Sequence, residues 1–233
     1  MIELDASGDG AAVVRLARPP VNALDRALVE AIADTVEEAV RGGAPAIVLT
    51  GRGSCFSAGI DTKLAASATR EQQADSILAI NRLVDALYSV PVPLVAALNG
   101  HALGGGLVVA LACDMRVAAT GAYKLGLNEA AAGVPFPAGP LRVVSAELDP
   151  SVLRELCLTS RIVEPGEALA LRVVDELCDP AALEERATRL AVELASQPAF
   201  GAVKTQLRAP VAAELRRIAV SGEDPMIERW LDR

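Results

Sequence analysis

Two glycine-containing segments place backbone N–H groups where a reaction could use them. They are residues 56–61 (FSAGID) and residues 99–106 (NGHALGGG), and each follows an apolar run of strand length. The second segment runs into an apolar helical pattern, so its free N–H groups would lie at the positive end of a helix dipole. An oxygen that becomes anionic during a reaction would be stabilised there. The alternative is that the glycine triplet serves tight packing of an alanine-rich core.

One glutamate stands alone in an uncharged stretch further along the chain. Glu129 lies in residues 125–137 (LGLNEAAAGVPFP), and the next charged residue is Arg142. Apolar surroundings disfavour the ionised carboxylate, which raises its pKa toward the range useful for proton transfer. The alternative is a solvated glutamate in a surface loop.

The sequence offers few residues for nucleophilic catalysis or for binding a metal ion. The chain has one histidine, His101, and four cysteines without a CxxC pair, so it lacks the ligand pattern of a zinc site. A serine hydrolase would have to pair His101 with Ser54 or Ser57, and no aspartate nearby has an evident orienting role. We therefore interpret His101 as a turn residue or a satisfied structural histidine, predict no metal, and expect free thiols in a reducing cytoplasm.

Composition and charge limit the classes of function. The 233 residues are 52% hydrophobic and 3% aromatic, which excludes a disordered chain and predicts a core of small aliphatic side chains. A net charge of −8 is unsuited to neutralising nucleic-acid phosphates. The N-terminus lacks the features of a signal peptide, and prolines and glycines interrupt the uncharged stretch 86–113. We expect a soluble cytoplasmic protein without a nucleic-acid or membrane partner.

Alternating strand and helix patterns predict an α/β core over residues 1–149. Apolar residues recur every four positions from Leu24 to Val36, so we expect an amphipathic helix over residues 24–41. The other expected core elements are helices at 70–88 and 104–113 and strands at 12–16, 46–50, 92–98 and 115–119. Residues 150–233 are predicted to form a C-terminal helical region, with helices near 151–158, 180–197, 199–208 and 211–220.

Taken together, these segments resemble the enoyl-CoA hydratase/isomerase, or crotonase, family over nearly the whole chain. The resemblance is carried, in order, by residues 18–24 (RPPVNAL), 46–51 (AIVLTG), 56–61, 99–106 and 113–118 (CDMRVA). It implies a crotonase-like spiral of strand–strand–helix units, with a C-terminal helical region that assembles a homotrimer or a dimer of trimers. It also implies an acyl-CoA thioester as substrate, with coenzyme A as part of that substrate and no separate cofactor.

The matching positions imply a catalytic set of two backbone amides and one carboxylate. The N–H groups of Ile60 and Gly105 would hold the thioester oxygen as it becomes an enolate. Losing one such donor costs about 2.7–4 kcal/mol of transition-state stabilisation. Hydratases of the family use two glutamates. The second of these matches Glu129, but Val108 stands where the first would fall.

This departure favours the Δ3-Δ2-enoyl-CoA isomerases of fatty-acid metabolism, whose Leu-Asn-Glu stretch is similar to residues 127–129. Isomerisation needs only one base, because Glu129 would take a proton from C2 and return it to C4. An apolar Val108 would exclude the water that a hydratase must hold. Hydration of a 2-enoyl-CoA is the alternative, and a non-catalytic acyl-CoA-binding protein is the alternative from another class. Asp114 and Glu147 stay open as replacements for the missing carboxylate.

The remaining candidates are substrate contacts. Lys63 and Lys204 are the first candidates for the phosphates of coenzyme A, followed by Arg15 and Arg18. The acyl pocket is expected between the helix after Leu64 and residues 134–136. The complete predicted substrate-binding set is Ala58, Asp61, Lys63, Leu64, Val108, Val134, Pro135, Phe136 and Lys204. Arg172 replaces a turn glycine common in relatives, which leaves the geometry of that turn to be determined.

Overall fold

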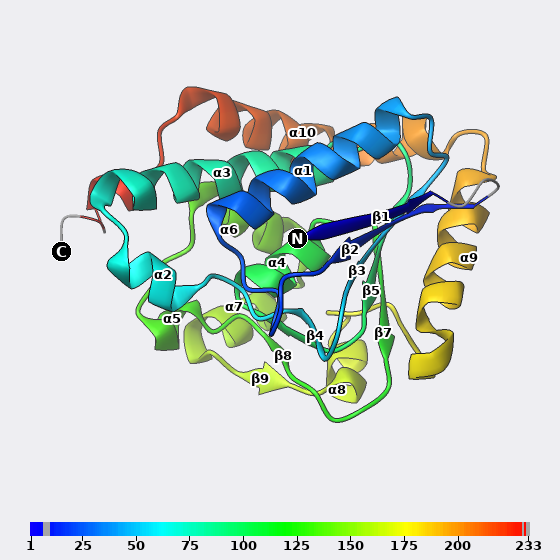
Figure 1. The fold of residues 1–233 in the computed structure, drawn as a ribbon, viewed down its shortest axis with the longest axis horizontal. Coiled ribbons are helices and arrows are strands. Elements are labelled where there is room, and N and C mark those ends of the chain that lie inside the picture. Colours follow the sequence, from blue (N-terminus) through cyan, green and yellow to red (C-terminus); the bar gives the residue numbers. More distant parts are fainter. Residues whose placement is uncertain (7–9, 230, 232–233) are drawn as a thin grey trace.

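Two β-sheets form the frame of the protein in a computed structural model that describes residues 1–6, 10–229 and 231 (Figure 1). The larger sheet has six strands in the order β1-β2-β3-β5-β7-β10. The first pair is antiparallel, and every later pair is parallel. Its strands are β1 (Ile2–Ala6), β2 (Ala12–Leu16), β3 (Ile47–Gly51), β5 (Leu94–Leu98), β7 (Met115–Ala119) and β10 (Glu176–Cys178).

A smaller sheet is built mainly from short strands that follow the central strands of the larger sheet in the chain. Its four strands, β4, β6, β8 and β9, pair in that order. Each of β3, β5 and β7 is followed by one short strand of this sheet and then by helix, which is the predicted strand–strand–helix spiral. The strands are β4 (Cys55–Ser57), β6 (His101–Leu103), β8 (Leu125–Gly126) and β9 (Ile162–Val163).

Helices cover both faces of the larger sheet. Figure 1 shows α9 on one side of the strands, with α1, α3 and α4 on the other. The α1 helix packs on α3, which in turn packs on α10. These elements are α1 (Arg26–Arg41), α3 (Arg70–Tyr88), α4 (Gly105–Leu111), α9 (Leu183–Ala195) and α10 (Phe200–Ser221). The shorter helices are α2 (Thr62–Ser67), α5 (Glu129–Ala132), α6 (Ala138–Glu147), α7 (Pro150–Thr159), α8 (Pro165–Ala170), a 3-10 turn (Pro180–Ala182) and α11 (Pro225–Arg229).

The first helix begins two residues later than its apolar period predicts. Asp25 caps α1 by accepting from the Leu28 N–H at 2.8 Å. Leu24 instead forms a parallel bridge with Ile60, so its backbone belongs to the sheet-like part of the chain. The side chain of Leu24 is still buried in the core. The apolar period therefore predicts correctly that the Leu24 side chain is buried. It does not predict that the backbone becomes helical only after the N-cap.

Residues beyond 149 are mostly helical, as predicted, but they also complete both sheets. Strand β10 pairs with β7, and β9 pairs with β8. The helices predicted at 199–208 and 211–220 are one continuous α10 that contains Pro210. Arg172 adopts φ +57°, so the left-handed turn is kept without a glycine. The domain boundary at residue 149 stays a prediction.

The core is aliphatic, as the low aromatic content predicts. All five residues of β5 are buried, and the buried set is dominated by Leu, Val, Ile and Ala from both sheets and the helices around them. Close packing of small side chains requires close backbone approach. Among the described residues, no helix has both the length and the apolar character needed to cross a membrane.

Candidate active site

The two predicted amide donors lie beside each other. Gly59 has φ +81°, and a Cβ built on it would lie 2.5 Å from the Leu103 carbonyl oxygen and 3.2 Å from the Gly105 nitrogen. The loop after β4 therefore touches the glycine triplet backbone to backbone. A Cβ on Gly105 would in turn lie 3.7 Å from Ile60 Cδ1. Ile60 and Gly105 thus come from distant parts of the sequence and meet at one place.

Both of these N–H groups are free to receive a ligand oxygen. The Leu24 N–H donates to the Gly59 carbonyl at 2.7 Å, and the Asp61 N–H donates to the Leu24 carbonyl at 3.0 Å. This bridge uses the peptide groups on either side of Ile60 and leaves its own N–H out. Gly105 is the first residue of α4, where an N–H has no intrahelical acceptor. Across the described residues, no protein group accepts from either N–H.

Asn22 holds the loop that presents Ile60, and sequence reasoning missed this role. Its side chain is buried and its backbone has φ +50°. Asn22 Nδ2 donates to the Cys55 carbonyl at 2.8 Å and to the Phe56 carbonyl at 3.2 Å. The only sequence signal was its place in residues 18–24, because the carbonyls that its Nδ2 binds in the donor loop, those of Cys55 and Phe56, lie more than thirty positions away.

Ser57 and His101 do not form a hydrolase pair. Ser57 Oγ donates to the Asn22 carbonyl at 2.7 Å and accepts from the Gly59 N–H at 3.2 Å. His101 Nδ1 accepts from the Lys124 N–H at 3.1 Å. The serine therefore shapes the loop after β4. His101 is the first residue of strand β6, so the prediction of a turn residue is wrong, and its bonded Nδ1 fits a satisfied structural histidine. Neither geometry supports serine-hydrolase chemistry.

The carboxyl of Glu129 faces the glycine triplet. Glu129 opens α5, and a Cβ built on Gly104 would lie 3.3 Å from Glu129 Oε1. Glu129 Oε2 is buried and has no hydrogen-bond partner in the described structure. This burial raises the pKa of Glu129 to about 7, against a small opposing effect of its own backbone N–H. A carboxyl with such a pKa, next to the free Gly105 N–H, suits reversible proton transfer at neutral pH.

The glycine triplet combines close packing with a free backbone N–H. A Cβ on Gly106 would lie 2.2 Å from the Ser57 carbonyl oxygen, so the third glycine allows α4 to lie against β4. Gly104 has φ +50° and adjoins Glu129, while Gly105 presents its N–H. The packing interpretation is therefore confirmed for Gly106, and the donor role of Gly105 stays a prediction.

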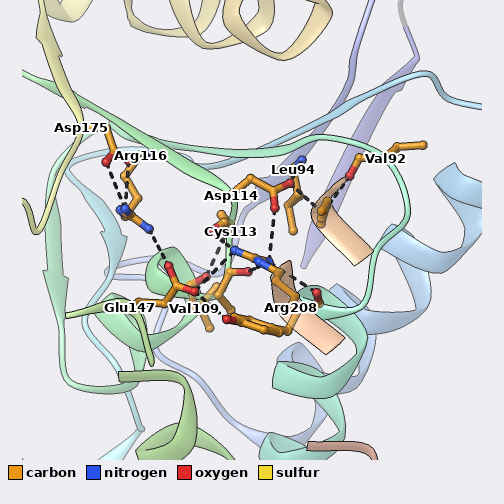
Figure 2. Close-up of polar contacts among 12 residues, drawn as sticks. Val92, Leu94, Val109, Cys113, Asp114, Arg116, Glu147, Asp175 and Arg208 are labelled. Carbon is orange, nitrogen blue, oxygen red and sulfur yellow. Dashed lines mark hydrogen bonds and ion pairs between the residues drawn. The ribbon is translucent and has the colours of Figure 1, made fainter. Parts of the chain in front are cut away.

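Neither of the two candidate acids, Asp114 and Glu147, is seen to take the place of the carboxylate missing at Val108. Val108 lies on α4 with 2% of its surface exposed and offers no proton acceptor. Asp114 Oδ2 accepts from the Leu94 N–H at 2.8 Å and from Lys204 Nζ at 2.7 Å (Figure 2). Glu147 Oε1 accepts from the Tyr88 hydroxyl at 2.7 Å. The Asp114 carboxyl thus binds the first residue of β5, whereas the glycine segment follows the last, and the Glu147 carboxyl is engaged by Tyr88, Arg116 and Arg208.

The prediction that Lys204 contacts phosphates is wrong. Its ammonium group is buried, donates to the Val92 carbonyl at 3.0 Å and pairs with Asp114. Burial lowers the pKa of Lys204, and Asp114 opposes that shift. Lys204 thus holds α10 against the start of strand β5.

The other basic candidates are also accounted for. Arg15 pairs with Asp5 and Glu184. Arg18 donates to the Ala23 carbonyl at 2.8 Å and pairs with Asp25 at 2.9 Å. The side chain of Lys63 lies outside the described residues, so its contact with phosphate stays a prediction.

The remaining predicted substrate contacts lie around the donor loop and after α5. Asp61 caps α2 by accepting from the Leu64 N–H at 3.1 Å, and it also lies 3.4 Å from Arg18. Leu64 is 50% exposed. Ala58, Val134 and Phe136 are half-buried and Pro135 is exposed, and the role of these residues in binding substrate stays a prediction.

Comparison with known proteins gives the same assignment. Residues 6–228 match the family described as enoyl-CoA hydratase/isomerase. The probable enoyl-CoA hydratase EchA17 of Mycobacterium tuberculosis is 38% identical over 180 residues, which cover 76% of this chain and 68% of that protein. The crystal structure of the probable enoyl-CoA hydratase EchA3 of Mycobacterium tuberculosis superposes with a TM-score of 0.86 at 30% identity, covering 94% of this chain and 92% of that chain.

A longer relative also matches. The glyoxysomal fatty acid beta-oxidation multifunctional protein MFP-a of Brassica napus is 33% identical over 227 residues, which are 95% of this chain. The chain spans 31% of the length of that protein. The family match across the chain, the superposition and the paired amides beside Glu129 agree: the chain belongs to the enoyl-CoA hydratase/isomerase, or crotonase, family.

Proposed function

We propose that the protein forms a thioester enolate from an acyl-CoA and shifts its double bond, as a Δ3-Δ2-enoyl-CoA isomerase of fatty-acid metabolism. One observation carries this proposal. The carboxyl of Glu129 lies against Gly104 and next to two free backbone N–H groups, and its Oε2 is buried without a partner in the described part of the chain. Val108 leaves the position of the second hydratase carboxylate apolar.

The proposed reaction uses the two backbone N–H groups to hold the thioester oxygen, and Glu129 first as a base and then as an acid. The thioester oxygen accepts from the Ile60 and Gly105 N–H groups, which stabilise the negative charge that develops there. The Glu129 carboxylate takes a proton from C2, and the electrons of that C–H bond delocalise to the thioester oxygen as a dienolate. The neutral Glu129 then gives the proton to C4, and the double bond forms between C2 and C3. Base and acid are regenerated, so no cofactor or water is consumed.

Hydration of a 2-enoyl-CoA is the second candidate, because the relatives named above are called probable enoyl-CoA hydratases. Hydration needs one group to deprotonate water and another to protonate C2. Glu129 supplies one such group, and Val108 supplies none. A non-catalytic acyl-CoA-binding protein is the third candidate, and the raised pKa of Glu129 argues against it because binding alone gains nothing from a buried carboxyl.

A direct comparison of two substrates tests the proposal. The purified protein receives a 3-enoyl-CoA or a 2-enoyl-CoA of equal chain length, and the products are separated by chromatography. We expect isomerisation to be faster than hydration, and we expect Glu129→Gln to lose isomerisation. Faster hydration would replace the isomerase assignment with the hydratase one. Activity in neither direction, with binding retained, would support the non-catalytic alternative.

We also propose that the protein acts as a homotrimer or a dimer of trimers. Large apolar side chains are exposed on α10 and α7, with Leu207 at 77%, Val220 at 75% and Leu158 at 74%. Contact with other copies would remove this surface from water. Light scattering coupled to size-exclusion chromatography tests this part, and a monomer would contradict it. A cytoplasmic location completes the proposal, since all four cysteines carry free thiols.

A further inference from the structure

The helix that carries Glu129 lacks a cap of its own. Helix α5 has four residues, and Asn128 at its N-cap makes no side-chain hydrogen bond to it. So short a helix leaves its first N–H groups without intrahelical acceptors and gains little stability from its own bonds. Something outside α5 must therefore fix the first turn if the Glu129 carboxyl is to stay against Gly104.

Ser160 supplies the missing cap from another helix. Its Oγ accepts from the Ala131 N–H at 3.0 Å, across 29 positions of sequence. Ala131 is the third residue of α5, and the N–H at that position is the one that an N-cap side chain ordinarily binds. Ser160 follows the end of α7, and α7 packs against α5.

The backbone of Ser160 gives a second, independent indication. Ser160 has φ +54°, a left-handed conformation that a serine rarely adopts and that glycine adopts without cost. A glycine would therefore suit the turn better than the residue present. The hydroxyl bond to α5 offsets the strain that the serine side chain brings to this turn.

Burial, rather than a neighbouring charge, sets the raised pKa of Glu129. Burial raises the pKa of the Cys157 thiol, on α7, to about 11, and the charge of Glu129 adds to this shift. This thiol is therefore neutral while Glu129 titrates. Arg161 adjoins Ser160 but pairs with Glu155 and Glu167, so its charge is already matched.

We propose that Ser160 is a positioning residue, which fixes the first turn of α5 and thereby holds the Glu129 carboxyl against the glycine triplet. The inference rests on the proposed role of Glu129 as the base. It adds that a residue of the C-terminal region sets the geometry of that base. Ser160 itself does not touch the reacting atoms.

The test compares Ser160→Gly with Ser160→Asn. Glycine removes the hydroxyl and relieves the positive φ, so the variant keeps its fold. We expect kcat for isomerisation to fall about tenfold or more, with KM within about twofold, because the amide donors lie on other segments. The acidic limb of the pH–rate profile should move to lower pH, since a loosened Glu129 gains water. Asparagine tolerates the left-handed conformation and offers an acceptor, so it should restore much of kcat.

Two controls separate the possible failures. Arg172→Gly relieves a similar φ of +57° at an exposed residue at the end of α8, and its kcat should equal that of the unmodified protein. If Glu129→Gln keeps its activity, the proposed function itself fails. If Glu129→Gln is inactive but Ser160→Gly keeps the original kcat and pH limb, the positioning role is overturned. A fall in kcat without a shift of the limb, and without rescue by asparagine, would also overturn it.

Discussion

The Oε1 atom of Glu129 packs against the Cα of Gly104, at a place where a Cβ would lie only 3.3 Å away. The Glu129 carboxyl can therefore occupy this place only because residue 104 has no side chain. Gly104 also has φ +50°, and it precedes the residue whose N–H is free. A side chain at this position would disturb the carboxyl and the amide together.

Gly104→Ala should accordingly lower activity more than it lowers stability. The new Cβ would press on the Asn128 and Glu129 side chains, so we expect kcat to fall about tenfold or more. The positive φ should cost about 1–2 kcal/mol in the free energy of unfolding. Gly43→Ala is the matched control, because Gly43 has φ +82° and open space around it. Equal kcat in the two variants would show that the Glu129–Gly104 contact is unimportant.

The raised pKa of Glu129 makes the folded state less stable as pH rises. Folding lifts the pKa of Glu129 from its ordinary value of 4.5 to about 7, so the folded state binds more protons than the unfolded state between these values. Stability therefore falls over this window and is constant with respect to this group above it. Glu129→Gln should remove the loss and stabilise the protein by about 2–3 kcal/mol at pH 8, with little effect near pH 4.

Urea unfolding of the two proteins at pH 4.5, 6 and 8 measures this difference. A variant that is less stable than the parent at pH 8 would show that the Glu129 carboxylate is well solvated or paired.

Val108→Glu should add hydratase activity. The new carboxyl would supply the group that hydration requires in addition to Glu129. Val108→Gln is the matched control, because the amide has nearly the same size and cannot act as a base. Both variants should lose stability, since Val108 is buried. Hydration of a 2-enoyl-CoA is measured for all three proteins. An equal rate in the Glu and Gln variants would mean that α4 does not aim this residue at the substrate.

Lys204→Met should affect stability without affecting substrate binding. Once the ammonium is gone, Asp114 keeps the Leu94 N–H bond at 2.8 Å and the Arg208 contact at 3.3 Å, but it loses its 2.7 Å ion pair, which leaves a buried charge poorly compensated. We expect a loss of about 3 kcal/mol in the free energy of unfolding and no change in KM for an acyl-CoA. Lys124→Met, at an exposed residue, is the control and should change neither quantity. A KM raised several-fold with unchanged stability would restore Lys204 as a phosphate contact.

Long apolar runs in the sequence predict the central strands of the larger sheet. The short strands of the smaller sheet have no such run and could not be predicted in this way. The run of residues 94–98 is buried throughout and was expected as a strand. Strands β8 and β9 have two residues each, which is too short for any period to show. They exist because the longer strands bring their ends together, and that is a tertiary effect.

The candidate site was predictable where one short segment carries the chemistry. Residues 56–61 and 99–106 contain the two amides, and the uncharged stretch around Glu129 explains its burial. Lys204 was misplaced because its partner, Asp114, lies 90 positions away. Asn22 and Ser160 were missed for the same reason, since each acts through hydrogen bonds to a distant segment. Local sequence patterns identify reactive groups better than the residues that hold them.

Exchange of deuterium into a saturated acyl-CoA tests the central claim most directly. In D2O, Glu129 should take a C2 proton while the Ile60 and Gly105 N–H groups hold the enolate oxygen, and it should return deuterium to C2. Mass spectrometry of the recovered thioester should show deuterium at C2 with the unmodified protein and none above background with Glu129→Gln. Absence of exchange with the unmodified protein, or equal exchange with both proteins, would contradict the account.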